Sequence, residues 1–186
     1  HQLQVLSTHD ELTGLPNRAW FVQQLGEAIS QALGHGEQMA VLLLNLDRFK
    51  DVNDSHGHDV GDQGLRLVAA QLRKIGGGGK AYRYGGEEFT LVFPGKSLAE
   101  CLPHLEVVRQ AIEVYRIQLR DKQQRPQDDK QGRQRRAGAR ASEVSVTVSM
   151  GVAERGQEQS RPEEVIKAAD KALYSAKSAG RNCIRS

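Results

Sequence analysis

The spacing of hydrophobic residues changes several times along the chain, and each change predicts a different element of secondary structure. After the turn-forming residues 13–17, apolar side chains recur every three or four positions, which predicts a helix that starts near Asn17. The apolar positions of this helix are Trp20, Phe21, Leu25, Ala28, Ile29 and Leu33. Met39–Leu46 is then a nearly unbroken apolar run. It is too short for a buried helix, so we expect it to form a central strand.

The middle of the chain predicts a helix followed by a β-hairpin. A second helical stripe begins around Asp59, and Gly76–Gly79 ends it. Its apolar positions are Leu65, Val68, Ala69 and Leu72. Two strand-like segments, 81–84 and 89–93, then flank a Gly-Gly pair, which predicts a hairpin with the glycines in or beside its turn.

The C-terminal half predicts a helix, a strand and a final helix. An amphipathic helix is expected over about 97–119, and three valines that alternate with small polar residues over 144–149 predict a strand. The last helix should start at Pro162, a residue favoured at the first helical position, and be capped by Gly180. It should bury Val165, Ile166, Ala169, Leu173 and Ala176. With a short strand at 182–184, this order of elements predicts an α/β domain with a mixed sheet.

Length and composition narrow the class of protein. The 186 residues suffice for one domain, and 38% hydrophobic with 26% charged residues is typical of a soluble globular protein. No apolar run approaches the roughly 18 residues that a membrane helix needs, and there is no signal-peptide pattern. Two cysteines, Cys101 and Cys183, are too few for a disulfide scaffold or a zinc cluster. We therefore expect a cytoplasmic domain, which a membrane-anchored sensor could carry.

The net charge of +3 is concentrated in one basic segment. Residues 120–143 contain 8 Lys or Arg and 4 Asp or Glu, whereas the rest of the chain contains 18 and 19. The simplest interpretation of this segment is a solvated loop. The alternatives are a segment that contacts an anionic membrane surface and one that contacts nucleic acid. No aromatic residue lies among these basic residues, so we expect no specific nucleic-acid partner.

Three polar clusters fall at the ends of predicted elements, where ligand sites of α/β domains usually lie. They span 45–62, 84–89 and 177–182. The adjacent carboxylates Glu87 and Glu88 follow two glycines. They form either an exposed acidic turn or a site that holds a metal or takes a proton.

Other polar residues differ in how well they suit a ligand site. Asn45 and Asp47 lie two apart at a strand end and therefore face the same side. With the glutamate pair they would form an oxygen-rich Mg²⁺ site, which suits phosphate chemistry. His56 and His58 are better explained as capping or solvated side chains than as a metal pair. Gly76–Lys80 lacks the Gly-Lys-Ser/Thr ending of a phosphate-binding loop, and we interpret it as a flexible linker.

These clusters, in this order, resemble the GGDEF domain of diguanylate cyclases. The name motif stands here as Gly85–Phe89, in the Glu variant GGEEF. The family's opening motif is matched by residues 10–18, DELTGLPNR, and its second block by positions within 49–62. Its closing blocks are matched by 149–152, 169–174, Lys177 and 180–182. The resemblance covers nearly everything from about Thr8 onward except the basic segment.

The resemblance implies an α+β fold like that of nucleotidyl cyclases and polymerase palms, with a mixed, mostly antiparallel five-stranded sheet wrapped by helices. It implies condensation of two GTP into cyclic di-GMP with release of two pyrophosphates, with Mg²⁺ or Mn²⁺ as cofactor. Each domain would hold one GTP, so two domains would meet head to head in a transient homodimer. Residues 8–186 would form the GGDEF domain, and 1–7 would be the stub of a helix from an upstream sensory domain, or else a disordered terminus.

The family's functional residues carry over position by position. The guanine base would be hydrogen-bonded by Asp62 and Asn53 and packed by Leu12 and Leu65. The phosphates would be bound by Lys50, Lys177, Arg181 and the backbone at Arg48 and Phe49. The metal would be bound by Glu87, Asn45 and the carbonyl of Leu46. The 3′-hydroxyl would lose its proton with help from Glu87 or Glu88.

One departure from the family's pattern concerns the metal. The strand-end motif normally begins with a metal-binding aspartate, and Asn45 stands in its place. An amide oxygen brings no charge, and the lost attraction is about 4 kcal/mol for unit charges 4 Å apart at an effective dielectric of about 20. The domain would then be weak unless GTP delivers the metal or Asp47 substitutes. The sequence favours an active diguanylate cyclase, and the alternative is a catalytically weak domain that binds GTP or cyclic di-GMP as a regulatory module.

A second departure concerns feedback by the product. Active members often carry an Arg-x-x-Asp product-binding site shortly before the name motif, and the matching positions here are Gly76 and Gly79. We therefore expect no inhibition through that site. The basic segment 120–143 remains an alternative place of contact with the product.

Overall fold

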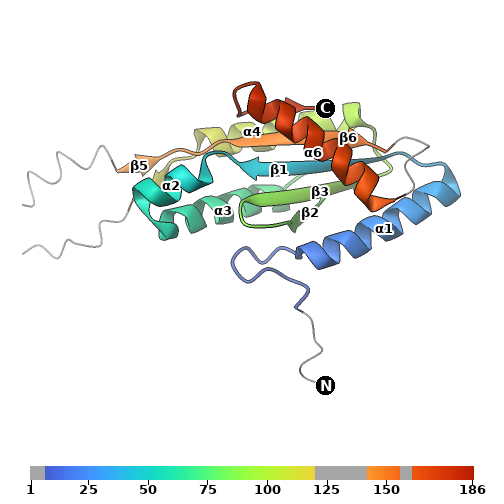
Figure 1. Ribbon diagram of the computed structural model, residues 1–186, viewed down its shortest axis with the longest axis horizontal. Helices are drawn as coiled ribbons and strands as arrows, with labels where there is room; N and C mark the ends of the chain where they lie inside the picture. The colour runs from blue at the N-terminus through green and yellow to red at the C-terminus, as the bar shows by residue number, and fades with distance from the viewer. Residues whose placement is uncertain (1–6, 120–141, 156–160) are drawn as a thin grey trace, which may run out of the picture.

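The computed structural model describes residues 7–119, 142–155 and 161–186, which form a five-stranded sheet with helices on both faces (Figure 1). The helices are α1 (Arg18–His35), α2 (Phe49–His56), α3 (His58–Arg73), α4 (Leu98–Val114) and α6 (Pro162–Ser178). The strands are β1 (Met39–Leu46), β2 (Lys80–Arg83), β3 (Glu88–Pro94), β4 (Ile117–Gln118), β5 (Glu143–Val144), β6 (Val148–Glu154) and β7 (Ile184–Arg185). The predicted N-terminal stub, except Ser7, and most of the basic segment lie outside the described residues.

The main sheet has the strand order β2-β3-β1-β6-β7. Its central strand β1 pairs antiparallel with β3 and β6, β2 pairs antiparallel with β3, and β7 runs parallel to β6. The mixed, mostly antiparallel five-stranded sheet is therefore confirmed, as is the hairpin formed by β2 and β3. β4 and β5 pair antiparallel as a separate two-stranded sheet.

β1 is buried at every position because its alternate side chains enter two different hydrophobic cores. Leu42, Leu44 and Leu46 pack with residues of α3 and α4 on one face of the sheet. Val41 and Leu43 pack with residues of α1 and α6 on the other face. Figure 1 shows these layers, with α1 and α6 in front of the sheet and α3 and α4 behind it. A strand covered on both faces explains the unbroken apolar run.

The helix starts agree with the capping signals in the sequence. The Asn17 side chain accepts a hydrogen bond from the Trp20 N–H (3.1 Å) at the start of α1. Ser97 and Glu100 form a capping box at the start of α4. Pro162 is the first residue of α6, as predicted. No helix within the described ranges is long and apolar enough to cross a membrane.

The helix expected over 97–119 ends earlier, at Val114. Tyr115 has an extended backbone, and Ile117 in β4 pairs with Val144 in β5. Ile117 is buried in the core. The local pattern favours a longer helix, but pairing between segments far apart in the sequence overrides it.

The strand expected over 144–149 is divided between two sheets. Val144 ends β5, and β6 begins only at Val148 and pairs with β1. The alternating valines, with Val146 between the two strands, are all buried. The valines therefore pack inward as the alternation indicates, but the predicted strand is interrupted.

Three further predictions differ from the structure in detail. A short helix, α2, follows β1, and it has no fully buried residue that would have produced a hydrophobic stripe. Leu33 is 51% exposed because Ala32 takes the inward position near the end of α1. The final strand starts at Ile184 rather than at Asn182, because Asn182 has a left-handed backbone (φ 48°).

Residues 8–17 form a turn that Arg83 fixes to the Gly-Gly hairpin. Arg83 Nη1 lies 2.9 Å from Asp10 Oδ2, and Arg83 Nε donates to the carbonyl oxygen of Gly85 (2.7 Å). Asp10 also accepts hydrogen bonds from the N–H and the hydroxyl of Thr13 (2.9 and 2.7 Å). The turn and the hairpin therefore share one hydrogen-bonded network.

The ionised form of Asp10 is favoured by this network. Partial burial by itself raises the pKa of Asp10, but the hydrogen bonds from Thr13 and the charge of Arg83 outweigh it, and the pKa lies below its ordinary value of 3.8. A carboxylate whose pKa is lowered by folding stabilises the fold above its unfolded pKa. This contribution is lost as the pH falls through the folded pKa.

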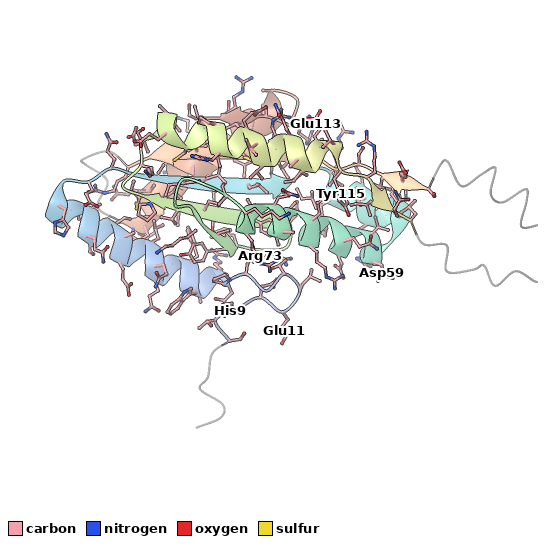
Figure 2. All side chains as sticks on the ribbon, turned by 180° about the vertical axis from the view of Figure 1, so that it is seen from behind. His9, Glu11, Asp59, Arg73, Glu113 and Tyr115 are labelled. Carbon is pink, nitrogen blue, oxygen red and sulfur yellow. The ribbon has the colours of Figure 1, made fainter. Side chains whose placement is uncertain are left out.

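We expect Asp10→Asn to lower the free energy of unfolding by about 1–2 kcal/mol at about pH 7, because it removes a charged hydrogen-bond acceptor. The difference from wild type should shrink as the pH falls below 3.8. Urea unfolding at about pH 7, 4 and 2.5 measures both effects. The matched control is Glu11→Gln, which replaces an exposed carboxylate of the same turn (Figure 2). It should change neither the free energy of unfolding at about pH 7 nor its dependence on pH. A difference for Asp10→Asn that stays constant down to the lowest pH would contradict the prediction.

Candidate functional site

A cleft opens at the C-terminal end of β1, and three distant parts of the chain line it. β1 and α2 contribute the consecutive residues 45–51, the hairpin contributes Glu87, and the end of α6 with the following loop contributes Lys177 and Arg181. The lining residues are Asn45, Leu46, Asp47, Arg48, Phe49, Lys50, Asp51, Glu87, Lys177 and Arg181, around a volume of about 190 Å³. Every residue predicted to bind the metal or the phosphates therefore lines one cleft.

The register between β1 and β3 brings Glu87 to this cleft. The Leu46 N–H donates to the carbonyl oxygen of Glu87 (3.0 Å), which extends the ladder one step beyond β3. Glu88, the first residue of β3, lies opposite Asn45 in the ladder, and Asn45 is only 4% exposed. Of the two predicted catalytic carboxylates, Glu87 lines the cleft and Glu88 is not among the lining residues.

The chain turns from β1 into α2 at Arg48. Its backbone is left-handed (φ 54°), which is uncommon for a residue other than glycine, and α2 begins at the next residue, Phe49. The first N–H groups of a helix have no partner within the helix and carry partial positive charge. Phe49 and Lys50 line the cleft, so the N-terminus of α2 lies beside it.

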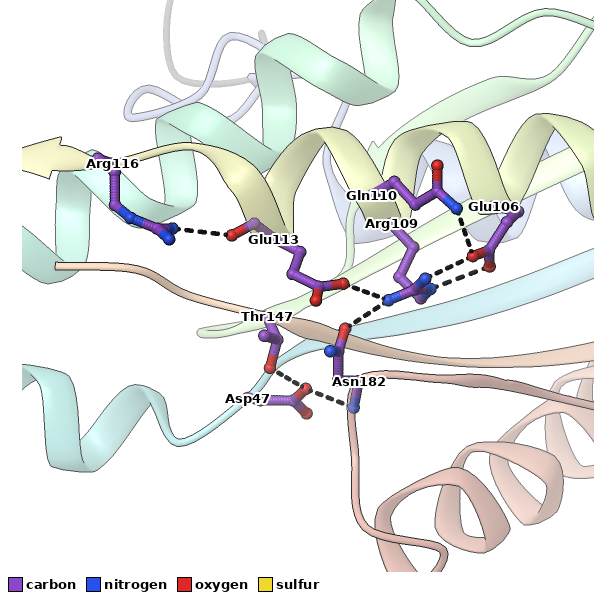
Figure 3. A network of polar contacts seen from close by, with 8 residues as sticks. All are labelled: Asp47, Glu106, Arg109, Gln110, Glu113, Arg116, Thr147 and Asn182. Atoms are coloured by element: carbon purple, nitrogen blue, oxygen red, sulfur yellow. Dashed lines mark hydrogen bonds and ion pairs between the residues drawn. The ribbon is translucent and has the colours of Figure 1, made fainter.

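Asp47 lines the cleft, but its carboxylate is already engaged. It accepts hydrogen bonds from the Thr147 hydroxyl (2.8 Å), the Ser149 hydroxyl (2.6 Å) and the Asn182 N–H (3.0 Å), and Figure 3 shows the first and the last of these. A carboxylate offers about four lone-pair sites, so most of its capacity is used. The sequence suggested Asp47 as a substitute metal ligand beside Asn45. In the sequence, the only indication of these hydrogen-bond donors is that small polar residues, including Thr147 and Ser149, alternate with valines over 144–149.

The cleft carries charges of both signs. Its cationic side chains are Arg48, Lys50, Lys177 and Arg181, and its carboxylates are Asp47, Asp51 and Glu87. Lys177 lies in the last turn of α6, where the helix dipole favours a cation. Excess positive charge beside a few carboxylates suits a polyanion that is bound together with a divalent cation.

The residues predicted to bind the base lie outside this cleft, on α2, α3 and the N-terminal turn. Asp62 lines a separate hollow at the turn between α2 and α3. Asn53 packs against Gly61, and the buried Asn53 Oδ1 has no hydrogen-bond partner among the described residues. Leu65 is buried, and Leu12 packs half-buried against the same core. The structure therefore brings the metal and phosphate residues together, but it does not bring the base residues into the same cleft.

Comparisons with known proteins agree with the motifs in the sequence. The family model described as "Diguanylate cyclase, GGDEF domain" matches residues 7–131 and 129–183. The response regulator PleD of Caulobacter vibrioides is 34% identical over 99% of this chain and 37% of its own length. The diguanylate cyclase VdcA of Vibrio cholerae is 38% identical over 93% of this chain and 45% of its own length. The chain thus spans less than half the length of these two relatives.

A solved structure shows the same fold. The crystal structure of the GGDEF domain of DgcB from Caulobacter crescentus, in complex with c-di-GMP, matches with a TM-score of 0.81 at 32% identity. The match covers 100% of this chain and 96% of that one. Sequence motifs, sheet topology and relatives point to one conclusion, which is that this chain belongs to the GGDEF domain family of the diguanylate cyclases.

Proposed function

We propose that this domain condenses two molecules of GTP into cyclic di-GMP and releases two pyrophosphates, acting as a head-to-head homodimer with Mg²⁺ or Mn²⁺. One observation carries the proposal, namely that Glu87, Lys177 and Arg181 line a single cleft although they come from the hairpin and the end of the chain. This combination of carboxylate and cations is the one that a nucleoside triphosphate and its divalent cation need.

The triphosphate would be bound by cations and backbone N–H groups. Lys50, Lys177 and Arg181 would supply the positive charge. The N-terminus of α2 after Arg48 would supply backbone donors, since helix N-termini favour anions.

The divalent cation would be held by oxygen atoms. Glu87 supplies a carboxylate, Asn45 an amide oxygen and Leu46 a carbonyl, and all three line the cleft. These are the hard ligands that Mg²⁺ and Mn²⁺ take, so the donor set fits, although it contains only one carboxylate. The cation would polarise the α-phosphate and neutralise charge on the leaving pyrophosphate.

The reaction needs two copies of the domain. The 3′-oxygen of one GTP would attack the α-phosphorus of the other, a P–O bond to the pyrophosphate would break, and the same step in the opposite direction would close the ring. Glu87 or Glu88 would accept the proton of the 3′-hydroxyl, and we favour Glu87 because it lines the cleft. Positioning of the two nucleotides would supply most of the rate acceleration.

Guanine would be recognised by Asn53 and Asp62. Guanine offers two donors on its Watson–Crick edge, which one carboxylate can accept, and adenine does not offer that pattern. Asn53 Oδ1 has no hydrogen-bond partner among the described residues, so no hydrogen bond of this atom would have to break for the side chain to turn toward a base. Such a site should discriminate strongly against ATP.

One observation favours the alternative, a catalytically weak domain that binds GTP or cyclic di-GMP as a regulatory module. Asn45 supplies no charge at the cleft, and Asp47 is poorly placed to replace it because its carboxylate already accepts three hydrogen bonds. The negative charge that Asn45 does not supply would then have to come from the phosphates of GTP.

Feedback through the family's Arg-x-x-Asp site should be absent. A Cβ atom added at Gly76 would lie 2.8 Å from His104 Nδ1, and one added at Gly79 would lie 2.6 Å from Phe93 Cε1. The two positions therefore have no room for longer side chains without a shift of these rings.

The partners of the full protein are a further part of this proposal. Because the chain spans 37% of PleD and 45% of VdcA, we propose that an upstream sensory domain controls how two copies of this domain meet. A cytoplasmic location is part of the same proposal, because GTP is a cytoplasmic substrate.

The proposal is tested by incubating the purified domain with GTP and Mg²⁺ or Mn²⁺ and measuring the linear intermediate and cyclic di-GMP by chromatography. We expect product from wild type, none from Glu87→Ala, and at least about tenfold faster turnover from Asn45→Asp, because the added charge attracts the cation. Binding of GTP without turnover in wild type, with turnover restored by Asn45→Asp, would establish the regulatory alternative. Absence of both GTP binding and turnover in wild type and in Asn45→Asp would refute both.

The base site is tested by Gly61→Ala. The added Cβ would lie 1.9 Å from Asn53 Oδ1 and 3.2 Å from Phe49 Cε2, so the Asn53 side chain must move. We expect the affinity for GTP to fall about tenfold while weak binding of ATP stays the same, because only guanine uses Asn53. Calorimetry measures both affinities.

Gly34→Ala is the matched control for this substitution. Gly34 lies in α1, and apart from its chain neighbours and the nearby backbone of the same helix, no described atom lies within 4 Å of its added Cβ. Its GTP affinity should equal that of wild type. An unchanged affinity in Gly61→Ala would show that Asn53 does not read the base.

A further inference from the structure

The loop after α6 contains three consecutive residues with positive φ, namely Gly180 (109°), Arg181 (64°) and Asn182 (48°). Gly180 adopts this conformation freely and ends α6 in a Schellman-type turn, in which the Arg181 N–H donates to the carbonyl of Ala176 (3.1 Å). For Arg181 the left-handed backbone is unfavourable, whereas asparagine tolerates it better than most other residues. Contacts from outside the loop would offset the cost at Arg181.

Two such contacts converge on Asn182 (Figure 3). Its backbone N–H donates to Asp47 Oδ2 (3.0 Å), at the end of β1. Its side-chain Oδ1 accepts a hydrogen bond from Arg109 Nη1 (2.8 Å), which reaches down from α4. Asn182 is thus held from two sides by elements that precede it by more than seventy residues.

Arg109 is itself held in place on α4. Its guanidinium is paired with Glu106 and with Glu113 (2.6 Å from Nη1), which lie one turn before and one turn after it. The hydrogen bond with Glu106 and that with Glu113 raise the pKa of Arg109 further, against the opposing effect of partial burial. The Arg109 side chain is only 14% exposed. The planar guanidinium of Arg109 has little conformational freedom because two carboxylates hold it, so its Nη1 points toward Asn182 in a defined direction.

We propose that Arg109 is a positioning residue of the phosphate site, which acts through Asn182 to fix the loop that carries Arg181. Arg109 is not among the residues that line the cleft, and its polar partners in the described part of the chain are Glu106, Glu113 and Asn182. The inference rests on the proposed function, in which Arg181 binds the triphosphate.

The physical reason is preorganisation. Arg181 is exposed, and a side chain on a relaxed loop would lose conformational freedom when it binds phosphate. The clamp on Asn182 restricts the backbone of that loop before the ligand arrives. Without Arg109 the loop can leave the left-handed conformation, and Arg181 then moves away from the other cations of the cleft.

A double-mutant cycle tests this mechanism. Binding of 3′-deoxy-GTP with Mg²⁺, which lacks the attacking hydroxyl, is measured by calorimetry for wild type, Arg109→Gln, Arg181→Ala and the double variant. We expect Arg109→Gln to weaken binding about tenfold, and to weaken it less than about twofold when Arg181 is already alanine. A residue that only stabilised the fold would weaken binding equally in both backgrounds.

A second variant removes the same contact without leaving unpaired carboxylates on α4. Asn182→Gly deletes the acceptor of Arg109, keeps the N–H that donates to Asp47 and accepts a positive φ. It should weaken binding by a factor similar to that of Arg109→Gln. Arg116→Gln is the matched control, since exposed Arg116, two residues after α4 ends, donates to the carbonyl of Glu113 and has no hydrogen bond with Asn182 in the described part of the chain.

The outcomes separate this inference from the proposed function. If wild type binds the nucleotide but Arg109→Gln and Asn182→Gly bind it equally well, the positioning role is wrong and the proposed function stands. Additive losses in the cycle likewise overturn the positioning role. A wild-type domain that does not bind the nucleotide removes the proposed function and this inference with it.

Discussion

The carboxylate of Asp47 connects three segments of the chain at the cleft by hydrogen bonds. It lies at the end of the central strand, is 7% exposed, and accepts hydrogen bonds from Thr147 and Ser149 near the start of β6 and from the backbone of Asn182 after α6. A buried carboxylate must be satisfied by donors, and the donors must in turn find an acceptor. This mutual requirement fixes the end of the neighbouring strand and the loop that carries Arg181 relative to β1.

The hydrogen bonds of Asp47 also limit the negative charge that the cleft can offer to a cation. Because Asp47 is committed to internal hydrogen bonds, a cation bound in the cleft as proposed would depend on Glu87, the uncharged Asn45 and the carbonyl of Leu46. Among the described residues, the cleft is lined by four cationic residues, Arg48, Lys50, Lys177 and Arg181, and by three acidic ones, Asp47, Asp51 and Glu87. The family and the fold of the chain are shown, whereas the proposed cyclase activity would depend on an amide, Asn45, at a position where a carboxylate is expected.

Several elements were predictable from local sequence because their determinants are local. The apolar run Met39–Leu46 has the length of a strand, and Asn17 and Pro162 mark helix starts by their side-chain chemistry. The end of α4 was not predictable, since Ile117 leaves the helical pattern to pair with Val144. That pairing joins segments far apart in the sequence, and the residue pattern of neither segment identifies the other as its partner.

For the site, the sequence by itself determined which residue types occur and in which motifs, including Glu87, Lys177 and Arg181. These motifs are short, and their chemistry can be read from the side chains alone. Only the tertiary structure decided that these three line one cleft, that Glu88 and Asp62 do not line it, and that Arg109 reaches Asn182. The physical reason is that strand register and helix packing set distances between segments, and a linear pattern carries no information about such distances.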